Sequence, residues 1–308
     1  MQSLDDGFLF RALLDSMPDS VYVKDRGARL TRVSRSMTRN LGFADPAEVV
    51  GKSDVDLFGT DFGHRTYIED LRVMDTDEAI SGLIESRQLA DGRLNWTLTT
   101  KLPVHDAAGQ VIGLLGISRE INELKEAEVS LQYLATHDSL TSLPNRFLLM
   151  DRLTQVLARA ERDTVPFGVL FVDIDDFKAI NDTSGHESGD AVLRSIAARM
   201  LSCVRASDTV ARLGGDEFVV ILEHARRDEA SAIADRIRVS VCEPIIDQRR
   251  QHLVTASVGI SLFPDHAADA SGLITAADYA MYLAKRNGKD RSAMCPTDGL
   301  PSAETPAP

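Results

Sequence analysis

The residues best suited to chemistry in this chain are acids that follow apolar runs or lie between them. Asp173 and Asp175 close a nearly continuous apolar run, and Gly214-Gly-Asp-Glu217 separates two apolar runs that predict the strands of a hairpin. Because side chains alternate between the faces of a strand, Asp173 and Asp175 are expected on one face. Crowded carboxylates repel one another, and a hard divalent cation relieves that repulsion. If the buried strand lies beside the hairpin, Asp173 and the acids of the hairpin can hold one Mg²⁺ ion.

The two glycines of this stretch fit a metal and phosphate site, although a simpler interpretation exists. Glycine reaches positive φ without a steric penalty, so Gly214 and Gly215 suit the bend of a hairpin. Without a side chain at position 215, a phosphate group could also approach the backbone closely. The simpler alternative is a solvated hairpin tip and an acidic loop, with Asp182 or Asp190 as the N-cap of a helix. The gathering of several carboxylates favours the metal and phosphate site.

The composition narrows the class of protein. The chain has 308 residues, enough for about two domains, and its 44% hydrophobic and 26% charged residues are ordinary for a globular protein. A formal net charge of −13 argues against a nucleic-acid surface, but a metal ion and a few lysines could still neutralise a nucleotide. Three scattered cysteines argue against a disulfide framework, and no apolar run is long enough for membrane insertion. A reduced, cytoplasmic location is therefore expected.

The N-terminal part, residues 1–120, is expected to form one small α+β unit. Residues 8–17 have helical spacing, and residues 20–24 are a short β-rich run. Helical and loop segments are expected to follow up to about residue 80. Two strand-like runs, 94–104 and 111–118, flank a turn signal and predict a closing antiparallel hairpin.

The segment 121–135 predicts a connecting helix that brings two chains together. Ile121, Leu124, Leu131 and Ala135 recur at steps of three, seven and four, which places them on one seam of a helix. Two heptads make a short coiled coil, and a helix packed on its own domain is the alternative. Its place between two domains favours a dimerising connector, so a homodimer is expected.

The C-terminal unit, residues 136–292, is expected to alternate helices and strands around a buried central strand. The run 167–175 is apolar on both faces, as a central strand is. The elements expected after it are an amphipathic helix at 190–201, the hairpin, a helix near 227–242, a strand at 253–261 and a helix near 275–286. The last stretch, 293–308, is rich in proline and lacks an apolar pattern, which predicts a disordered tail.

Several motifs of this unit closely resemble those of the GGDEF family of diguanylate cyclases. They are the entry stretch 137–146 (HDSLTSLPNR), the acidic stretch 173–190, the bend 214–218 (GGDEF), the strand 257–261 and the helix 277–288. The entry stretch has Ser142 where glycine is usual. The family fold is like that of adenylyl cyclase catalytic domains and the polymerase palm. The resemblance implies an enzyme that joins two GTP molecules into cyclic di-GMP and releases two pyrophosphates.

The resemblance also implies which residues act in catalysis and metal binding. Asp173, the Ile174 carbonyl and Asp216 would hold Mg²⁺ or Mn²⁺, and Glu217 would support a second metal ion. Asp216 would favour deprotonation of the ribose 3′-hydroxyl that attacks the α-phosphate, and Lys178 would help to neutralise the triphosphate. These roles agree with the chemistry of phosphoryl transfer, which needs positioning, metal and positive charge more than covalent catalysis.

For the substrate, the resemblance implies contacts to guanine and to phosphate. Asn181 and Asp190 would recognise the guanine edge, His186 lies in the same substrate-binding stretch, and Gly215 would admit a phosphate. Lys285 and Lys289 would neutralise the triphosphate. Lys289 lies in Gly-Lys-Asp where the family often has Gly-Arg-Asn, so the bidentate contact that arginine offers is lost there.

An Arg-x-x-Asp pair, Arg205 and Asp208, precedes Gly214 at the spacing that marks an inhibitory product site in the GGDEF family. An arginine fork can hold phosphate and the guanine edge, and Arg236 would add a second charge from a neighbouring domain. The alternative for Arg205 and Asp208 is an ordinary surface ion pair. The resemblance therefore implies that cyclic di-GMP is both product and inhibitor.

Residues 1–120 resemble a PAS sensor domain, an antiparallel sheet with flanking helices. The resemblance rests on the stretches 51–57 (GKSDVDL), 91–96 (DGRLNW) and 116–121 (GISREI). The unit has no cysteine for a flavin adduct, and His64 is the obvious candidate for an axial haem ligand. A small organic ligand, or none, is the favoured alternative to haem. The identity of the PAS ligand stays open.

Three functions follow as hypotheses, in descending order of support. The first is a diguanylate cyclase regulated by a PAS sensor. The second is a catalytically silent GGDEF receptor that binds cyclic di-GMP or GTP, and the third is a structural dimerisation protein. The intact acidic motif and the intact Asp173 favour the enzyme. No second catalytic domain that would hydrolyse cyclic di-GMP is recognisable in the sequence.

Overall fold

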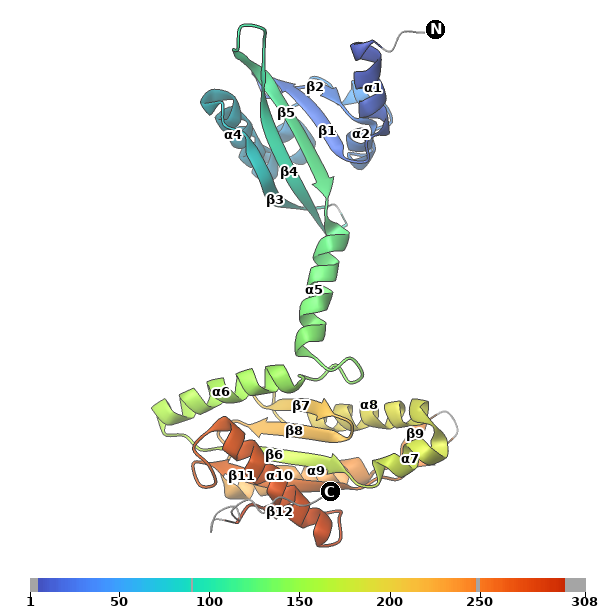
Figure 1. Ribbon diagram of the computed structural model, residues 1–308, viewed down its shortest axis with the longest axis vertical. Helices are drawn as coiled ribbons and strands as arrows, with labels where there is room; N and C mark the ends of the chain where they lie inside the picture. Colours follow the sequence, from blue (N-terminus) through green and yellow to red (C-terminus); the bar gives the residue numbers. More distant parts are fainter. Residues whose placement is uncertain (1–4, 90, 248–249, 297–308) are drawn as a thin grey trace. The chain divides into compact units, whose positions relative to one another are not determined.

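The computed structural model describes residues 5–89, 91–247 and 250–296. The chain divides into two compact units, residues 1–129 and 130–308, each of which contains a five-stranded sheet (Figure 1). Among the described residues, no helix combines the length and the apolar character that a membrane span requires. The mixture of helices and strands confirms the predicted α+β class.

The first unit is built on an antiparallel sheet whose strands follow the order β2-β1-β5-β4-β3. The strands are β1 (Ser20–Asp25), β2 (Leu30–Val33), β3 (Ile80–Gln88), β4 (Leu94–His105) and β5 (Val111–Glu120). The helices are α1 (Asp6–Ser16), α2 (Arg35–Asn40), the 3-10 helix η1 (Pro46–Glu48), α3 (Asp54–Phe58) and α4 (Thr60–Thr76). Apolar side chains of α2, α3 and α4 pack against β1, β2 and β5 and form the core of the unit.

The predicted hairpin is present as β4 and β5, whereas the sequence pattern predicts neither β2 nor β3. β3 is an edge strand that pairs only with β4. Its residues are all half-buried or exposed, and they include Gly82, Glu85 and Arg87. It therefore lacks the alternation of apolar and polar residues by which a half-buried strand is recognised.

The connecting helix α5 (Asn122–Thr136) begins directly after β5 and starts one residue later than predicted. Ile121 is only 8% exposed, and its backbone N–H donates to the Trp96 carbonyl at 2.9 Å. Ile121 is therefore held in the first unit, which corrects its predicted place on an exposed seam. Leu124 and Leu131 are 63% and 67% exposed, so within the part of the chain that the structure describes these seam residues are mostly uncovered.

The second unit has a sheet in the order β12-β11-β6-β8-β7. All its pairings are antiparallel except that of β11 with β12. The strands are β6 (Phe167–Ile174), β7 (Thr209–Gly214), β8 (Glu217–Leu222), β11 (Ala256–Phe263) and β12 (Ser292–Met294), with a separate hairpin of β9 (Ile245–Asp247) and β10 (Arg250–His252). The helices are α6 (Arg146–Asp163), α7 (Phe177–Ser184), α8 (His186–Ser202), α9 (Arg227–Cys242) and α10 (Ala270–Arg286).

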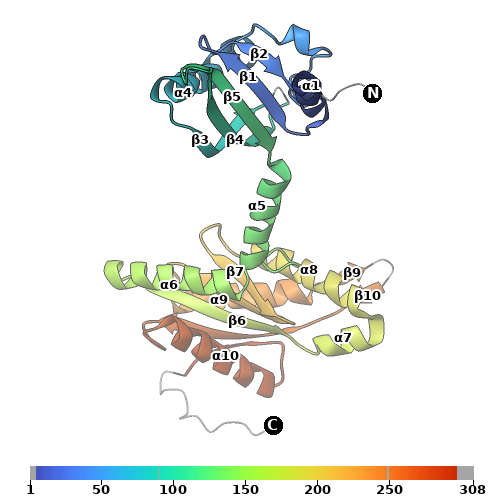
Figure 2. The ribbon, with the colours of Figure 1, turned by 45° about the horizontal axis from the view of Figure 1, so that its top comes forward.

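The central strand β6 is buried along its whole length, as predicted, because helices cover both faces of the sheet (Figure 2). On one face, Leu170, Val172 and Ile174 pack with apolar residues of α8 and α9. On the other face, Val169 and Phe171 pack with α6 and α10. Consecutive residues of β6 therefore belong to different cores, which explains why this strand has no alternation in its sequence. The arrangement leaves the polar end of β6, at Asp173, on the α6 and α10 face.

The predicted boundary at residue 292 differs from the structure. β12 continues to Met294, and the Cys295 backbone N–H donates to the Ile260 carbonyl at 2.8 Å. Cys295 is buried, so residues 293–295 belong to the folded unit and not to a tail. The remaining part of the predicted tail, 297–308, lies outside the described residues.

Candidate functional site

The acids singled out by the sequence meet where β6 ends and β8 begins. Asp173 and Glu217 are directly opposite partners in the register of these two antiparallel strands. Opposite partners project from the same face, with Cβ atoms about 5 Å apart. Asp216 precedes this pair, and its carbonyl accepts a hydrogen bond from the Ile174 N–H at 3.3 Å. The hairpin therefore lies against the central strand, and three carboxylates converge at one end of the sheet.

This convergence and the burial of the carboxylates shift their proton affinities. Burial, with the neighbouring charges of Asp216 and Glu217, raises the pKa of Asp173 to about 6, although Lys285 opposes the shift. Burial also raises the pKa of Glu217, with contributions from the charges of Asp278 and Asp216. The pKa of Asp278 is raised by burial as well. The site is thus a set of acids whose negative charge is only partly compensated.

The nearest positive charge is on α10. Lys285 Nζ lies 2.7 Å from a carboxylate oxygen of Asp173, and the Asp173 side chain is only 8% exposed. Lys285 itself is about one-third exposed, so its amine can be reached from solvent. One lysine therefore partly neutralises the acidic group from the helix that covers this face.

Asp175 has a different environment from Asp173. Its carboxylate accepts hydrogen bonds from the hydroxyls of Thr255 and Ser257 at 2.6 and 2.8 Å, and from the Asp290 N–H at 3.1 Å. These donors come from the start of β11 and from the loop after α10. Asp175 therefore holds neighbouring segments together and does not join the acids of the hairpin.

The turn of the hairpin uses both glycines as the sequence predicts. Gly214 and Gly215 have φ values of +150° and +52°, a region that favours glycine. No atom lies within 4 Å of the position that a Cβ would occupy at either residue. The backbone of the turn is therefore open to a close approach by a ligand.

An arginine that the sequence did not single out holds this turn. Arg212 donates from Nε and Nη2 to the Gly215 carbonyl at 3.0 and 2.6 Å, and from Nη1 to Asp138 at 2.9 Å. Asp138 also accepts from the N–H and the hydroxyl of Thr141. Burial raises the pKa of Asp138, but the hydrogen bonds from Thr141 and Arg212 outweigh it and hold the pKa below its ordinary value. We call this arrangement of Asp138, Arg212 and the Gly215 carbonyl the turn clasp.

The residues expected to contact guanine lie at the junction of α7 and α8. A Cβ at Gly189 would come within 2.0 Å of Asn181 Oδ1, so the glycine leaves room for the Asn181 side chain at this junction. Asp190 follows Gly189 and is half-buried. His186 is exposed at the first residue of α8. Asn181 and Asp190 thus belong to one helix junction.

In the part of the chain that the structure describes, the two remaining lysines, Lys178 and Lys289, do not contact the acids of the hairpin. Lys178 is exposed on α7, and among the described residues it has no hydrogen bond or ion pair to Asp173, Asp216 or Glu217. Lys289 follows α10 and pairs with Asp176 at 2.7 Å. That hydrogen bond, with the charge of Asp176, raises the pKa of Lys289. Of the three lysines, only Lys285 touches the acidic group directly.

The predicted inhibitory residues lie near the start of β7. Arg205 is exposed and pairs with Glu229 at 2.6 Å. The Asp208 carboxylate accepts hydrogen bonds from the N–H groups of Arg205 and Glu223 at 2.9 and 3.1 Å. Arg236 on α9 donates to the Cys203 carbonyl. The Arg205 and Asp208 side chains therefore point to different partners and do not form an ion pair with each other.

The chemistry of the donor set suits a hard cation, although the structure has no preformed cage. Within the described ranges, no group of three or more His, Cys, Asp or Glu residues is arranged to hold a metal ion. The oxygens of Asp173, Asp216 and Glu217 are nevertheless of the kind that Mg²⁺ and Mn²⁺ prefer. Burial and like charge raise the pKa values of Asp173 and Glu217, and a bound cation would reverse that effect.

Comparison with known proteins assigns both units to families. The family model described as "Diguanylate cyclase, GGDEF domain" matches residues 135–291, which is half of the chain. The chain belongs to the GGDEF family of diguanylate cyclases. A second model, described as "PAS fold", matches residues 14–126. Both predicted resemblances are therefore confirmed.

Individual relatives support the same families. A diguanylate cyclase of Vibrio cholerae is 33% identical over 287 residues, which cover 92% of this GGDEF protein and 88% of the relative. MucR of Pseudomonas aeruginosa, a bifunctional diguanylate cyclase and cyclic di-GMP phosphodiesterase, is 44% identical over 167 residues. That match covers 54% of the present chain and only 24% of MucR. The chain thus spans nearly all of one relative and about a quarter of the other.

Two solved structures resemble the second unit. The GGDEF domain of TpbB from Pseudomonas aeruginosa is 43% identical, covers 53% of this chain and 95% of its own, and has a TM-score of 0.51. The coiled coil and GGDEF domain of DgcB from Caulobacter crescentus, solved in complex with c-di-GMP, is 29% identical. It covers 56% of this chain and 93% of its own, with a TM-score of 0.52. These matches confirm the predicted GGDEF fold.

Proposed function

We propose that this GGDEF protein condenses two GTP molecules into cyclic di-GMP and releases two pyrophosphates. The observation that supports the proposal most is the convergence of Asp173, Asp216 and Glu217 beside an open Gly-Gly turn. A silent receptor is not favoured, because the acids are all present and a relative that matches nearly the whole chain is a diguanylate cyclase. GTP is a cytoplasmic nucleotide, so we place the reaction in the cytoplasm.

Diguanylate cyclases generally depend on a divalent metal ion. Here Asp173, Asp216 and the Ile174 carbonyl would hold Mg²⁺ or Mn²⁺, with Glu217 supporting a second ion. When bound, the metal would offset the charge of the triphosphate and increase the acidity of the ribose 3′-hydroxyl. Asp216, at the turn, would orient that hydroxyl toward the α-phosphate of the second GTP. Lys285 lies beside Asp173, where its ammonium group can offset negative charge on the leaving pyrophosphate.

The substrate would be held on both sides of the acids. Asn181 and Asp190 would accept and donate hydrogen bonds at the guanine edge, and His186 would border that contact. The open backbone at Gly215 would admit the phosphates, and Lys178 and Lys289 would add positive charge at the periphery. Each domain would bind one GTP, so two chains must face each other for the reaction, which makes a homodimer part of the proposal.

The proposal is tested by pyrophosphate release from the purified protein. With GTP and Mg²⁺ or Mn²⁺ we expect continuous release, and with EDTA we expect none above background. ATP should be a poor substrate, because the proposed contacts of Asn181 and Asp190 recognise guanine. Equal release with and without the metal, or equal use of ATP and GTP, would contradict the proposed chemistry.

The turn clasp gives a prediction about positioning. Arg212→Gln removes two hydrogen bonds to the Gly215 carbonyl, so the acids of the turn should move from their place beside Asp173. We expect turnover to fall by about tenfold or more, because small displacements of reacting groups are costly. Arg152→Gln is the matched control, since Arg152 contacts Thr209 at the far end of β7. Steady-state rates of GTP turnover are measured for both variants. An equal loss of turnover in both would argue against a specific role of the turn clasp.

Product feedback gives a prediction for Arg205. We propose that cyclic di-GMP binds at Arg205 and Asp208, with Arg236 of a neighbouring domain as a further contact. Arg205→Ala should raise the inhibitory concentration of cyclic di-GMP by about tenfold or more, because a charged hydrogen-bond donor to phosphate is lost. The initial rate without product should change less than about twofold.

Progress curves with added cyclic di-GMP measure this effect. Arg162→Ala is a suitable control, because Arg162 is similarly exposed and its one ion pair within the described residues is with its neighbour Asp163. If product inhibits the wild type and the Arg205→Ala variant equally, Arg205 has no part in inhibition and is an ordinary surface residue.

A further inference from the structure

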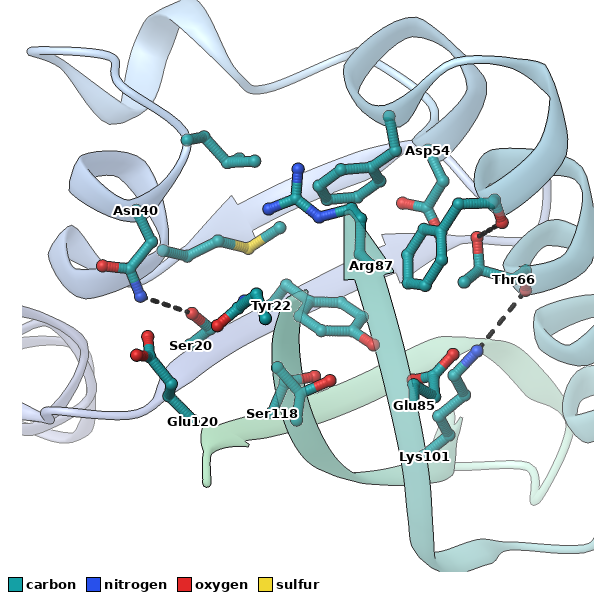
Figure 3. Close-up of a pocket in the computed structure, with 16 residues that line it drawn as sticks. Ser20, Tyr22, Asn40, Asp54, Thr66, Glu85, Arg87, Lys101, Ser118 and Glu120 are labelled. Atoms are coloured by element: carbon teal, nitrogen blue, oxygen red, sulfur yellow. Dashed lines mark hydrogen bonds between the residues drawn. The ribbon is translucent and has the colours of Figure 1, made fainter. Parts of the chain in front are cut away.

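The first unit contains a cavity of about 100 Å³ between its sheet and the helices α2, α3 and α4 (Figure 3). Its apolar lining includes Met37 of α2, Leu41 directly after α2, Phe58 of α3 and Phe62 of α4. An engineered apolar cavity of about 150 Å³ in another protein holds benzene, which has six non-hydrogen atoms, so this cavity suits a small molecule of about that size or less. His64 is exposed on α4 and is not among the lining residues, so the cavity offers no histidine for haem.

Two opposite charges that have no ion-pair partner among the described residues line this cavity. Glu85 and Arg87 lie two residues apart on β3, and their partners in the register are Thr97 and Asn95. Residues at this spacing share one face of a strand and lie about 6.6 Å apart. Figure 3 shows both side chains extending from β3 among the lining residues.

Both charged side chains are partly shielded from water, and neither has a partner that fully offsets its charge. Among the described residues, the Glu85 Oε1 atom is buried and has no hydrogen-bond partner. The Arg87 guanidinium is 4.8 Å from the centre of the Phe58 ring, and the described part of the chain gives it no carboxylate partner. Burial raises the pKa of Glu85, although the charge of Lys101 and a hydrogen bond with Thr99 oppose the shift, and burial lowers the pKa of Arg87. A buried charge without a partner is costly, so a ligand that pairs with it gains affinity.

The other charged groups around the cavity already have partners, including Glu120, which accepts a hydrogen bond from Asn122. Lys24 bonds to Asp54 at 2.6 Å and to Asp70. Lys101 bonds to Asp70 at 2.8 Å and to Glu69 at 3.0 Å. These buried pairs fix the helices to the sheet, and they leave Glu85 and Arg87 as the groups with unused bonding capacity.

We propose that this cavity binds a small α-amino acid with an apolar side chain, whose carboxylate pairs with Arg87 and whose ammonium group pairs with Glu85. A zwitterion is the ligand class that satisfies both charges at once. An ammonium and a carboxylate on one carbon can each make a charge-assisted hydrogen bond of about 2.8 Å, one to each of two side chains that project from the same face of a strand. The side chain of the amino acid would lie against Phe58, Phe62 and Met37.

Two residues that line this cavity form hydrogen bonds with Asn122, the first residue of the connecting helix. Asn122 donates from Nδ2 to Asn95 at 2.9 Å and to Glu120 at 2.7 Å, and both of these residues line the cavity. Its Oδ1 accepts from the Trp96 N–H at 2.6 Å. A ligand that moves β3 or β4 therefore acts on the first turn of α5 through Asn122. This link would carry ligand binding to the proposed cyclase activity.

Calorimetric titration of the full chain tests the binding site directly. The probes are L-alanine, L-valine and L-leucine, each with the matching carboxylic acid that lacks the amine and the matching amine that lacks the carboxylate. We expect at least one amino acid to bind, and both of its analogues to bind at least about tenfold more weakly. Absence of binding by all three amino acids, or equal binding of the analogues, would overturn the proposal.

Two variants assign the charges to the ligand groups. Arg87→Gln should weaken binding of the amino acid at least about tenfold, and Glu85→Gln should remove the preference for the amino acid over the matching acid. Arg93→Gln, at an exposed position of the same unit, should leave the affinity unchanged. Both amide variants remove a poorly compensated buried charge, so their unfolding temperatures should not fall. Wild-type affinity and selectivity in both variants would contradict the assignment. If a variant misfolds, the titrations of the wild-type protein with the analogues still test whether the cavity binds an amino acid.

The link to α5 is tested with Asn122→Asp. This variant keeps the oxygen that accepts from Trp96 but loses both donor contacts to the cavity. Binding should persist, while the effect of the amino acid on GTP turnover should disappear. A turnover response equal to that of the wild type would refute the link. The turnover measurement rests on the proposed cyclase function, whereas the calorimetric measurement does not. A protein that binds the amino acid but does not turn over GTP would therefore contradict the cyclase proposal and not the ligand site.

Discussion

Replacing Asp216 with asparagine should lower the rate of cyclic di-GMP formation by about three orders of magnitude. The asparagine side chain has nearly the same shape, but it lacks the charge that would hold the metal and orient the ribose hydroxyl. The hydrogen bond from Ile174 uses the backbone carbonyl of residue 216, so the strand pairing stays intact. Asp173→Asn should have a similar effect, because it removes the facing carboxylate on β6.

The measurement is the initial rate of product formation at saturating GTP and Mg²⁺. Asp182→Asn is the matched control, because Asp182 is an exposed aspartate on α7 in the same acidic stretch. It should change the rate by less than about twofold. If Asp216→Asn keeps more than about a tenth of the wild-type rate, the turn carboxylate does not have the proposed role.

Charges on the seam of α5 should separate the two chains of the proposed dimer. Leu124 and Leu131 are seven residues apart and mostly exposed, so their apolar surface is available to a second copy of the helix. Burial of a leucine contributes about 1.5–3 kcal/mol, and a dimer would bury four of them. We therefore expect Leu124→Glu with Leu131→Glu to raise the dimer dissociation constant at least about a thousandfold.

Turnover per chain should fall with the dimer content, since each domain supplies only one of the two GTP sites. Val129→Glu is the matched control, because Val129 is 64% exposed and lies about 140° around the helix from Leu124. Sedimentation velocity gives the dimer content, and steady-state rates give the turnover. Unchanged sedimentation and unchanged turnover in the double variant would show that the seam has no part in assembly.

The sequence predicted the GGDEF unit well, because its signals are local and strong. The buried run at β6, the Gly-Gly bend and the helix at α9 lie where the pattern places them. The sequence analysis expected Asp173 near the acids of the hairpin if the strand lay beside it, and the strand register pairs Asp173 with Glu217. In each of these cases, period, burial and turn chemistry indicate the same structure.

The parts that the sequence did not reveal depend on contacts between distant residues. The turn clasp joins Arg212 to Asp138 across 74 positions, and nothing in the spacing of either residue indicates the other. Ile121 has seam spacing, yet the Trp96 carbonyl holds it in the first unit. The edge strand β3 lacks a regular pattern, and two of its residues, Glu85 and Arg87, line the cavity proposed as a ligand site. A sequence that departs from a simple pattern at a binding site is to be expected.

Chromatography of the reaction products tests the central proposal most directly. Purified protein incubated with GTP and Mg²⁺ should yield cyclic di-GMP, with two pyrophosphates released for each molecule formed. The Asp216→Asn variant, treated in the same way, should yield neither product above background. A wild-type reaction that leaves GTP unchanged, or that stops at a linear dinucleotide with one pyrophosphate, would contradict the proposed diguanylate cyclase activity.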